Sequence, residues 1–228
     1  MNWYRKIKLA DDMRDPSWED IERYGPKGEE FADGLEPDMS AYKLEENRRY
    51  MTPILRRTPF VQNYSWSAPT KDAIEKIKKF VAGGRVVEIG SGWGLWARLM
   101  KDVGINIVAT DVLQRDITQE HLNKNFDISK DDMLFTEVER INHQKAMEKY
   151  NNYDVLMMSW PPYDNPLANE TLLAFRGNKI IFIGEGQYGC TGDDSFFCNL
   201  YEKFEEAGRV DIPQWYGLHD DLSFWIRK

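Results

Sequence analysis

Short runs of apolar residues alternate with amphipathic stretches over most of the chain after residue 69. The apolar runs span 85–90, 105–110, 133–138, 154–160 and 179–184, and the third is the weakest. Stretches with apolar residues at helical spacing separate them, at 95–104, 116–125, 142–150, 166–176 and 194–207. Strands that are apolar throughout are typical of a parallel sheet covered by helices on both faces. The pattern therefore predicts a doubly wound α/β fold.

The two ends of this region extend the prediction. Before the first strand, Thr70 can cap a helix in which Ile74, Ile77 and Val81 recur at helical spacing. At the carboxyl end, 208–217 and 221–228 are strand-like, and the three residues between them are too few for a helical crossover. An antiparallel C-terminal hairpin is therefore expected to complete a mostly parallel seven-stranded sheet.

The first 68 residues follow a different pattern. They are rich in charge and interrupted by prolines and glycines, with two short helices predicted near 17–23 and 40–51. We interpret 1–68 as an N-terminal helical extension and 69–228 as the main domain. Within the extension, Trp66 lies in a segment that can fold over a ligand as a lid. Its basic doublets, Arg48–Arg49 and Arg56–Arg57, can meet a phosphate or lie on a solvated surface.

Composition and charge narrow the possible functions. Hydrophobic residues make up 42% of the 228 residues, which is typical of a folded protein. The net charge of -8 argues against a protein that binds duplex nucleic acid by neutralising many phosphates. The two cysteines, Cys190 and Cys198, form neither a CxxC pair nor a disulfide framework, so no metal is expected. No segment resembles a signal peptide or a membrane span, and we expect a cytoplasmic protein with no membrane partner.

Three glycines follow the first predicted strand. Gly90, Gly92 and Gly94 stand where the backbone must turn sharply and where a nucleotide-like ligand can lie against it. The dinucleotide fingerprint would need a glycine in place of Leu95, which disfavours NAD. A Walker loop would need Gly-Lys-Ser/Thr after the turn, and none is present.

This loop resembles motif I of the class I S-adenosylmethionine-dependent methyltransferases. The matching residues are Glu88, Gly90, Ser91, Gly92 and Gly94. Asp111 ends the second strand 21 residues after Gly90, where an acidic residue accepts hydrogen bonds from ribose hydroxyls. The resemblance covers about residues 70–228 and implies a Rossmann-like methyltransferase fold with S-adenosyl-L-methionine as cofactor.

The family also holds the cofactor's adenine after the third strand. Here Asn142 and His143 occupy the matching place, and the amide oxygen of Asn142 can accept a hydrogen bond from the exocyclic amine. Glu137 or Glu139 can serve instead. Asn142 can equally cap the helix that follows.

The fourth strand runs into Ser159, Trp160, Pro161, Pro162 and Tyr163. This resembles the Asp/Asn/Ser-Pro-Pro-Tyr/Phe signature of methyltransferases that modify exocyclic amines or amide nitrogens. The sequence departs from the signature at Trp160, because an indole cannot accept a hydrogen bond. The carbonyls of Trp160 and Pro161 can orient an amine, and Tyr163 can stack on a planar acceptor. The alternative is that both aromatic side chains belong to the core.

A polar, glycine-rich loop follows the fifth strand, at 184–194. We predict substrate contact for Glu185 and helix capping for Asp193. His219 and Asp220 are interpreted as turn residues of the terminal hairpin.

Together these features predict an S-adenosylmethionine-dependent methyltransferase. Nitrogen is the expected acceptor atom, since no His or Lys is placed to deprotonate a hydroxyl. The acceptor would be planar or amine-bearing, either a nucleic-acid base or a small molecule. The alternatives are a non-catalytic binding or scaffold protein with this fold and, less favoured, an NAD-dependent oxidoreductase.

Overall fold

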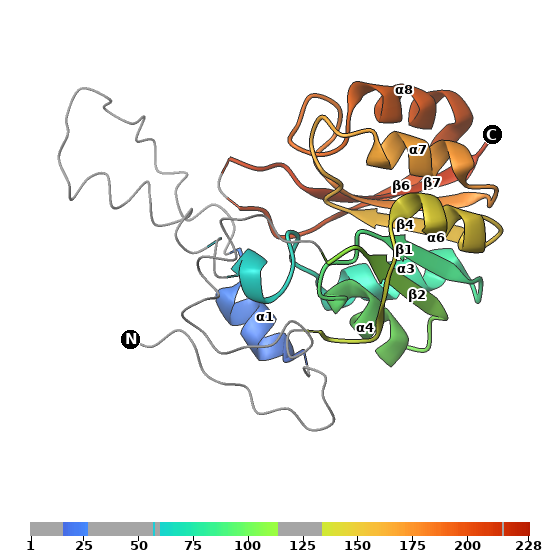
Figure 1. Ribbon diagram of the computed structural model, residues 1–228. Helices are drawn as coiled ribbons and strands as arrows, with labels where there is room; N and C mark the ends of the chain where they lie inside the picture. The colour runs from blue at the N-terminus through green and yellow to red at the C-terminus, as the bar shows by residue number, and fades with distance from the viewer. Residues whose placement is uncertain (1–15, 27–56, 58–59, 114–133, 216) are drawn as a thin grey trace, which may run out of the picture.

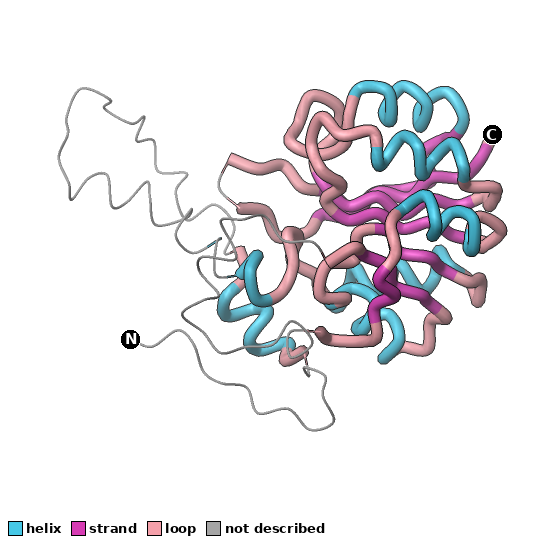
Figure 2. Tube along the Cα trace, in the orientation of Figure 1, coloured by secondary structure: helices cyan, strands magenta, loops and turns pink. Residues whose placement is uncertain are grey.

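A single sheet forms the centre of the molecule (Figures 1 and 2). The computed structural model describes residues 16–26, 57, 60–113, 134–215 and 217–228. Within these ranges the sheet has seven strands in the order β3-β2-β1-β4-β5-β7-β6. The strands are β1 (Val86–Ile89), β2 (Ile107–Asp111), β3 (Val138–Arg140), β4 (Val155–Ser159), β5 (Lys179–Gly184), β6 (Phe204–Asp211) and β7 (Asp221–Arg227).

The predicted fold class is confirmed. β1 pairs with β2 and β4 in parallel, and β2–β3 and β4–β5 are also parallel. β7 pairs antiparallel with both β5 and β6, so the terminal hairpin closes the sheet as expected. The molecule is a Rossmann-like methyltransferase fold: a mostly parallel, doubly wound sheet with an antiparallel C-terminal hairpin.

Helices cover both faces of the sheet. The described helices are α1 (Trp18–Tyr24), α3 (Lys71–Val81), α4 (Leu95–Asp102), α6 (His143–Tyr150), α7 (Leu167–Ala174) and α8 (Asp194–Lys203). Capping residues set several of their starts: the side chains of Thr70, Asn142 and Asp193 each accept a backbone N–H from the first turn that follows. The predicted capping by Thr70 and Asp193 is thus confirmed.

Alternate residues of the strands enter two separate cores. Val86 and Met157 pack with α3 and α4, whereas Val87, Leu156 and Met158 pack with α6, α7 and α8. This alternation explains why the strands are apolar throughout, because successive side chains point to opposite faces and both faces are buried.

Parts of the N-terminal segment share the first core. Ile21 of α1 and Phe60 are almost fully buried in it, as are Tyr64 and Ala68. Phe60 stacks on Tyr64 with ring centroids 5.1 Å apart, and Tyr64 stacks on Phe135 at 5.9 Å. These contacts hold the described part of the chain before α3 against the edge of the sheet domain.

Three predicted elements were wrong in extent. The third strand was expected at 133–138, but β3 begins at Val138. Phe135 instead lies buried beside α4, and its N–H bonds to the carbonyl of Trp93. The last helix was expected to reach 207, yet it ends at Lys203. Residues 204–206 pair with β7, and this pairing overrides the helical preference of Glu205 and Glu206. The strand that follows was expected at 208–217, but β6 covers Phe204–Asp211.

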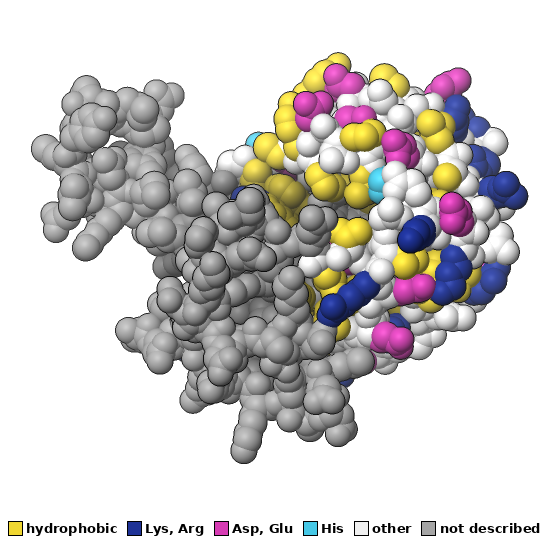
Figure 3. Space-filling view, viewed as in Figure 1, with side chains coloured by type: hydrophobic (Ala, Val, Ile, Leu, Met, Phe, Trp, Pro, Cys, Tyr) yellow, Lys and Arg dark blue, Asp and Glu magenta, His cyan; other side chains and the backbone are white. Residues whose placement is uncertain are grey.

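The helices predicted at 40–51 and 116–125 lie outside the described residues. Among the helices that are described, none has the length and apolar character needed to cross a lipid bilayer. Acidic and basic side chains are interspersed on the face shown in Figure 3.

Candidate functional site

A pocket of about 270 Å³ opens at the carboxyl ends of the central parallel strands. Seven residues predicted from the sequence line it: Trp66, Glu88, Gly90, Ser91, Gly92, Asp111 and Ser159. Gln62, Tyr64, Trp93 and Trp96 complete much of the wall. Ligands of open α/β sheets bind at this edge, where the strand order reverses. Here the reversal lies between β1 and β4, because β2 and β3 lie on one side of β1 and the later strands on the other.

The three positions of the loop require glycine for different structural reasons. All have positive φ, of 75° at Gly90, 55° at Gly92 and 74° at Gly94. A Cβ added at Gly90 or Gly92 would meet no atom within 4 Å, so open space lies above both. A Cβ at Gly94 would come within 2.9 Å of Thr136 Cγ2. Gly94 is therefore needed for packing, while Gly90 and Gly92 leave room for a ligand to approach the backbone.

Asp111 is tied to the glycine loop. Its Oδ2 accepts the Gly92 N–H at 2.8 Å, and its Oδ1 accepts the Leu113 N–H at 2.6 Å. Burial raises the pKa of Asp111, and the two amide donors partly offset the rise. Each carboxylate oxygen retains a second lone pair for hydroxyl groups of a ligand.

Glu88 and Ser91 carry buried polar atoms with no partner among the described residues: Glu88 Oε2 and Ser91 Oγ. Burial raises the pKa of Glu88 to about 8, and the nearby charge of Asp111 adds to the rise while Lys101 opposes it. Unpaired buried polar atoms are costly and uncommon in folded proteins. Their position in the pocket lining indicates a polar ligand.

Trp66 is carried by a segment anchored on the domain. Trp93 Nε1 donates to the Gln62 carbonyl at 2.9 Å, which fixes the start of this segment. Ser67 Oγ lies 2.9 Å from Ser159 Oγ and accepts from Trp96 Nε1 at 3.0 Å, which fixes its end. Trp66 lies between these anchors with 47% of its surface exposed, so its ring is available at the pocket rim.

Asn142 and His143 do not line this pocket. Asn142 Oδ1 accepts the Lys145 N–H at 3.0 Å, which confirms the capping alternative. His143 Nε2 lies 2.7 Å from Glu170 Oε2 on α7. Contact of either residue with a cofactor stays a prediction.

The Trp160–Tyr163 turn is locked to the glycine-rich loop that follows β5. Trp160 adopts a left-handed backbone with φ of 52°, which is unusual for a bulky residue. Its N–H bonds to the Ile183 carbonyl at 2.8 Å, and the Pro161 carbonyl accepts the Gly192 N–H at 3.1 Å. Tyr163 is 67% exposed, which places its ring at the surface and not in the core. Strained residues held in this way concentrate at functional sites.

Trp160 meets Trp66 and Arg57. The two indole rings stack with centroids 5.3 Å apart and an interplanar angle of 20°. The guanidinium carbon of Arg57 lies 5.0 Å from both ring centroids. The sequence did not indicate this contact, because Arg57 is about a hundred residues from Trp160.

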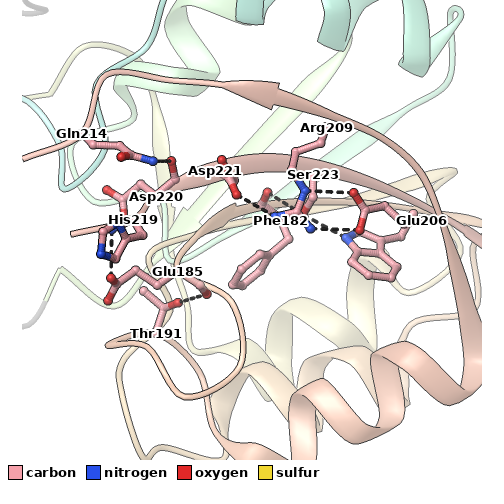
Figure 4. A network of polar contacts seen from close by, with 11 residues as sticks. Phe182, Glu185, Thr191, Glu206, Arg209, Gln214, His219, Asp220, Asp221 and Ser223 are labelled. Carbon is pink, nitrogen blue, oxygen red and sulfur yellow. Dashed lines mark hydrogen bonds and ion pairs between the residues drawn. The ribbon is translucent and has the colours of Figure 1, made fainter. Parts of the chain in front are cut away.

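Glu185 holds two loops together (Figure 4). Its carboxylate accepts the N–H of Cys190 at 2.7 Å and the N–H of His219 at 2.9 Å, and its carbonyl accepts the Thr191 hydroxyl. Burial by itself raises the pKa of Glu185, but these hydrogen bonds outweigh burial and leave the pKa below its ordinary value. Both oxygens are thus engaged with the backbone, and substrate contact by Glu185 stays a prediction.

A second hollow, of about 470 Å³, lies between α3 and the β6–β7 hairpin. It contains none of the residues predicted for function, and its lining includes the exposed side chains Asp72, Lys76 and Arg209. The smaller pocket at the strand ends remains the candidate site.

Comparison with known proteins adds information on the fold. No protein-family model matches the chain, and no curated protein matches it. Among solved structures, it is similar to magnesium protoporphyrin IX methyltransferase from Synechocystis PCC 6803 with bound SAM, with 10% identity over 69% of this chain and 79% of that one, and a TM-score of 0.43.

Two further solved structures are similar to the chain to about the same degree. A putative tRNA (m1A22) methyltransferase of Streptococcus pneumoniae, in complex with S-adenosyl-L-methionine, shares 13% identity over 70% of this chain and 73% of that one, with a TM-score of 0.44. A protein of the NADB-Rossmann superfamily from Streptococcus agalactiae shares 11% over 71% and 70%, with a TM-score of 0.42.

Proposed function

We propose that this protein binds S-adenosylmethionine in the pocket at the ends of β1 and β2 and transfers its methyl group to a nitrogen atom. The observation that carries the proposal is the pocket itself. Open space above Gly90 and Gly92 adjoins the Asp111 carboxylate and the unpaired atoms of Glu88 and Ser91.

The residues present fit this cofactor. Asp111 offers carboxylate oxygens to ribose hydroxyls at the end of the second strand, where acidic residues perform this role in nucleotide-binding folds. Glu88 and Ser91 offer polar atoms to the remainder of the ligand, and Trp66 provides an aromatic surface at the rim. Asn142 remains a candidate for the adenine only if its cap oxygen can accept a second hydrogen bond.

When bound, S-adenosylmethionine would supply the methyl group: the nitrogen lone pair would form the new carbon–nitrogen bond as the carbon–sulfur bond breaks, the bonding electron pair would stay on the sulfur, and the proton that the nitrogen then loses would pass to water. The protein's contribution is to hold the acceptor in line and exclude water, since proximity and orientation supply much of the acceleration. The turn at Trp160–Tyr163 adjoins the pocket through Ser159, so it is the proposed place for the acceptor. A neutral amine needs no strong base, which agrees with the residues at this edge.

Calorimetric titration with S-adenosylmethionine tests the first half of the proposal. Wild-type protein should bind it, whereas Asp111→Ala should bind more weakly by roughly 1–3 kcal/mol, because charged hydrogen bonds to the ribose are lost. Asp72→Ala, which removes an exposed carboxylate from α3, is the matched control and should bind as wild type does.

The other outcomes identify the alternatives. Binding of NAD in place of S-adenosylmethionine would favour an oxidoreductase. Binding of S-adenosylmethionine without transfer of a radioactive methyl group to any nucleobase or small amine would favour a binding or scaffold protein.

A further inference from the structure

Two carboxyl groups line the proposed cofactor pocket, and its described lining contains no lysine or arginine. The two groups belong to Glu88 on β1 and to Asp111 at the end of β2. Much of the remaining wall is aromatic and comes from Tyr64, Trp66, Trp93 and Trp96. Carboxylates and the faces of aromatic rings both attract cations. A pocket of this composition therefore favours a ligand that carries a positive charge.

The two carboxyl groups differ in what surrounds them. Asp111 accepts two backbone N–H groups, which stabilise its negative charge. Glu88 is only 1% exposed, and its Oε2 has no hydrogen-bond partner among the described residues. Burial without a donor disfavours the charged form of a carboxyl group. The surroundings of Glu88 thus favour its neutral form, whereas those of Asp111 provide for a charge.

The charges near Glu88 act in the same direction on balance. Burial raises the pKa of Glu88 to about 8, and Asp111 on the neighbouring strand adds to the rise. Lys101 on α4 opposes it, but Lys101 Nζ donates its hydrogen bond to Thr136 Oγ1 at 2.8 Å. Burial also lowers the pKa of Lys101 itself. Before a ligand binds, Glu88 is therefore mainly protonated at pH 7.

A cation in the pocket would reverse this balance. An opposite charge within a few ångströms of a carboxylate lowers its pKa by about 1–3. Because the pKa of Glu88 starts at about 8, a fall of this size would ionise the group near neutral pH. The unpaired Oε2 would then have a partner, and the proton would pass to solvent. A neutral ligand would have no such effect.

We propose that Glu88 recognises the positive charge of the cofactor by giving up a proton: it is protonated before S-adenosylmethionine binds and ionised when a cationic group of the ligand lies beside it. This inference rests on the proposed function and adds that cofactor binding is linked to proton release. S-adenosylmethionine carries two cationic groups, the sulfonium and the α-ammonium. Either one supplies the charge that Glu88 requires.

Calorimetry on the full chain at pH 7, in two buffers with different ionisation enthalpies, counts the protons released as S-adenosylmethionine binds. Wild type should release about half to one proton more than Glu88→Gln does. The affinity of wild type should correspondingly rise by roughly three- to tenfold from pH 6 to pH 7, and Glu88→Gln should lose most of this rise. Asp72→Asn removes an exposed carboxylate outside the pocket and should match wild type in both measurements.

Two analogues identify the cationic group. S-adenosylhomocysteine keeps the α-ammonium but lacks the sulfonium, and 5′-methylthioadenosine lacks both. If the ammonium faces Glu88, S-adenosylhomocysteine should release as many protons as S-adenosylmethionine does. If the sulfonium faces it, only S-adenosylmethionine should release them. In either case 5′-methylthioadenosine should release no more protons from wild type than from Glu88→Gln.

A spectroscopic measurement serves if Glu88→Gln binds too weakly for calorimetry. Infrared difference spectra of wild type, recorded with and without ¹³C-labelled glutamate, distinguish glutamic acid bands from those of aspartic acid. Binding of S-adenosylmethionine should remove the band of a protonated glutamic acid. Thermal unfolding of each variant shows that it folds.

Three results would overturn the inference. The first is equal proton release by wild type and Glu88→Gln, and the second is full release by 5′-methylthioadenosine. The third is a glutamic acid band that stays protonated when S-adenosylmethionine is bound. If wild type bound neither S-adenosylmethionine nor S-adenosylhomocysteine, the proposed function itself would be wrong.

Discussion

The pocket at the ends of β1 and β2 and the cluster around Trp160 lie at the same edge of the sheet but are built in different ways. The pocket wall comes mainly from two stretches of chain, residues 61–66 and 88–96, and the second carries the glycine motif. Asp111, Leu113 and Ser159 complete it. The cluster is assembled from Arg57, Trp160, Glu185 and Asp220, each on a separate segment. A local site can be recognised from a motif, whereas an assembled site depends on how several loops meet.

The two regions also hold their charges differently. Asp111 receives two backbone N–H groups, while Asp220 receives none. Glu185, close to Asp220, has both oxygens occupied by loop amides. Asp111 and Glu185 are thus paired with backbone amides, whereas the Asp220 carboxylate has no hydrogen-bond partner among the described residues.

The largest expected effect is the loss of ligand binding at the pocket formed by the glycine loop. Gly92→Val should abolish binding of S-adenosylmethionine in calorimetry while the protein stays folded, because the new side chain fills space that is otherwise open. Gly104→Val is the control for backbone strain, since its φ of 86° is also positive and its Cβ would meet no atom within 4 Å. Unchanged binding by Gly92→Val would remove the glycine loop from the site.

Gly94→Val offers a contrast within the same loop. Its Cβ would lie 2.9 Å from Thr136, so this variant should lower the thermal midpoint in addition to any loss of binding.

The next effect concerns the buried carboxyl group of Glu88. Its pKa is raised from 4.5 to about 8 in the folded protein, so between these values the unfolded chain loses a proton that the folded protein keeps. The free energy of unfolding should therefore fall as pH rises from 5 to 8, by at most about 1.4 kcal/mol per pH unit from this group. Above pH 8 its contribution should no longer change.

Glu88→Gln should flatten that part of the pH profile, as measured by denaturant unfolding at a series of pH values. Asp111 and Asp220 also have raised pKa values and contribute in the same direction, so some slope should remain. Identical profiles for variant and wild type would show that Glu88 is not the neutral buried acid inferred here.

A smaller effect distinguishes residues that contact the methyl acceptor from residues that contact the cofactor. Tyr163→Ala should leave the affinity for S-adenosylmethionine nearly intact but weaken a planar acceptor by about 1–3 kcal/mol, because the exposed ring would no longer stack on it. Steady-state kinetics would divide the loss between KM and kcat. Trp160→Phe keeps the backbone carbonyls and an aromatic face and should stay active. A Tyr163→Ala protein with full transfer but lost cofactor binding would contradict this assignment.

The smallest expected effect tests whether Asn142 only caps α6 or also contacts the cofactor. Removing its cap in Asn142→Ala should cost about 1 kcal/mol of stability, measured by denaturant unfolding. Asn142→Asp should restore that stability, since Asp caps equally well. If the cap is its whole role, calorimetry should find the same affinity for S-adenosylmethionine in all three proteins. A loss of affinity in Asn142→Ala would support the adenine contact predicted from the sequence.

The sequence by itself determined the strand and helix alternation, the glycine loop with Glu88 and Asp111, and the caps at Thr70 and Asp193. These features depend on periodicity or on spacing within a few residues, which backbone geometry translates directly into structure. The position of Asp111 at the pocket could also be predicted from the sequence, because parallel strands bring their carboxyl ends to one edge of the sheet.

Only the tertiary structure decided the start of β3, the extension of β6 into 204–207, the partners of Glu185 and the meeting of Arg57, Trp160 and Asp220. Pairing with β7 overrode the local helical preference at Glu205 and Glu206. The cluster joins residues more than a hundred positions apart, and its geometry follows from sheet order and loop packing, for which no short pattern in the chain carries a signal. The physical reason is that a local conformational preference acts over one or two turns of chain, whereas burial and pairing act between whichever surfaces the fold brings together.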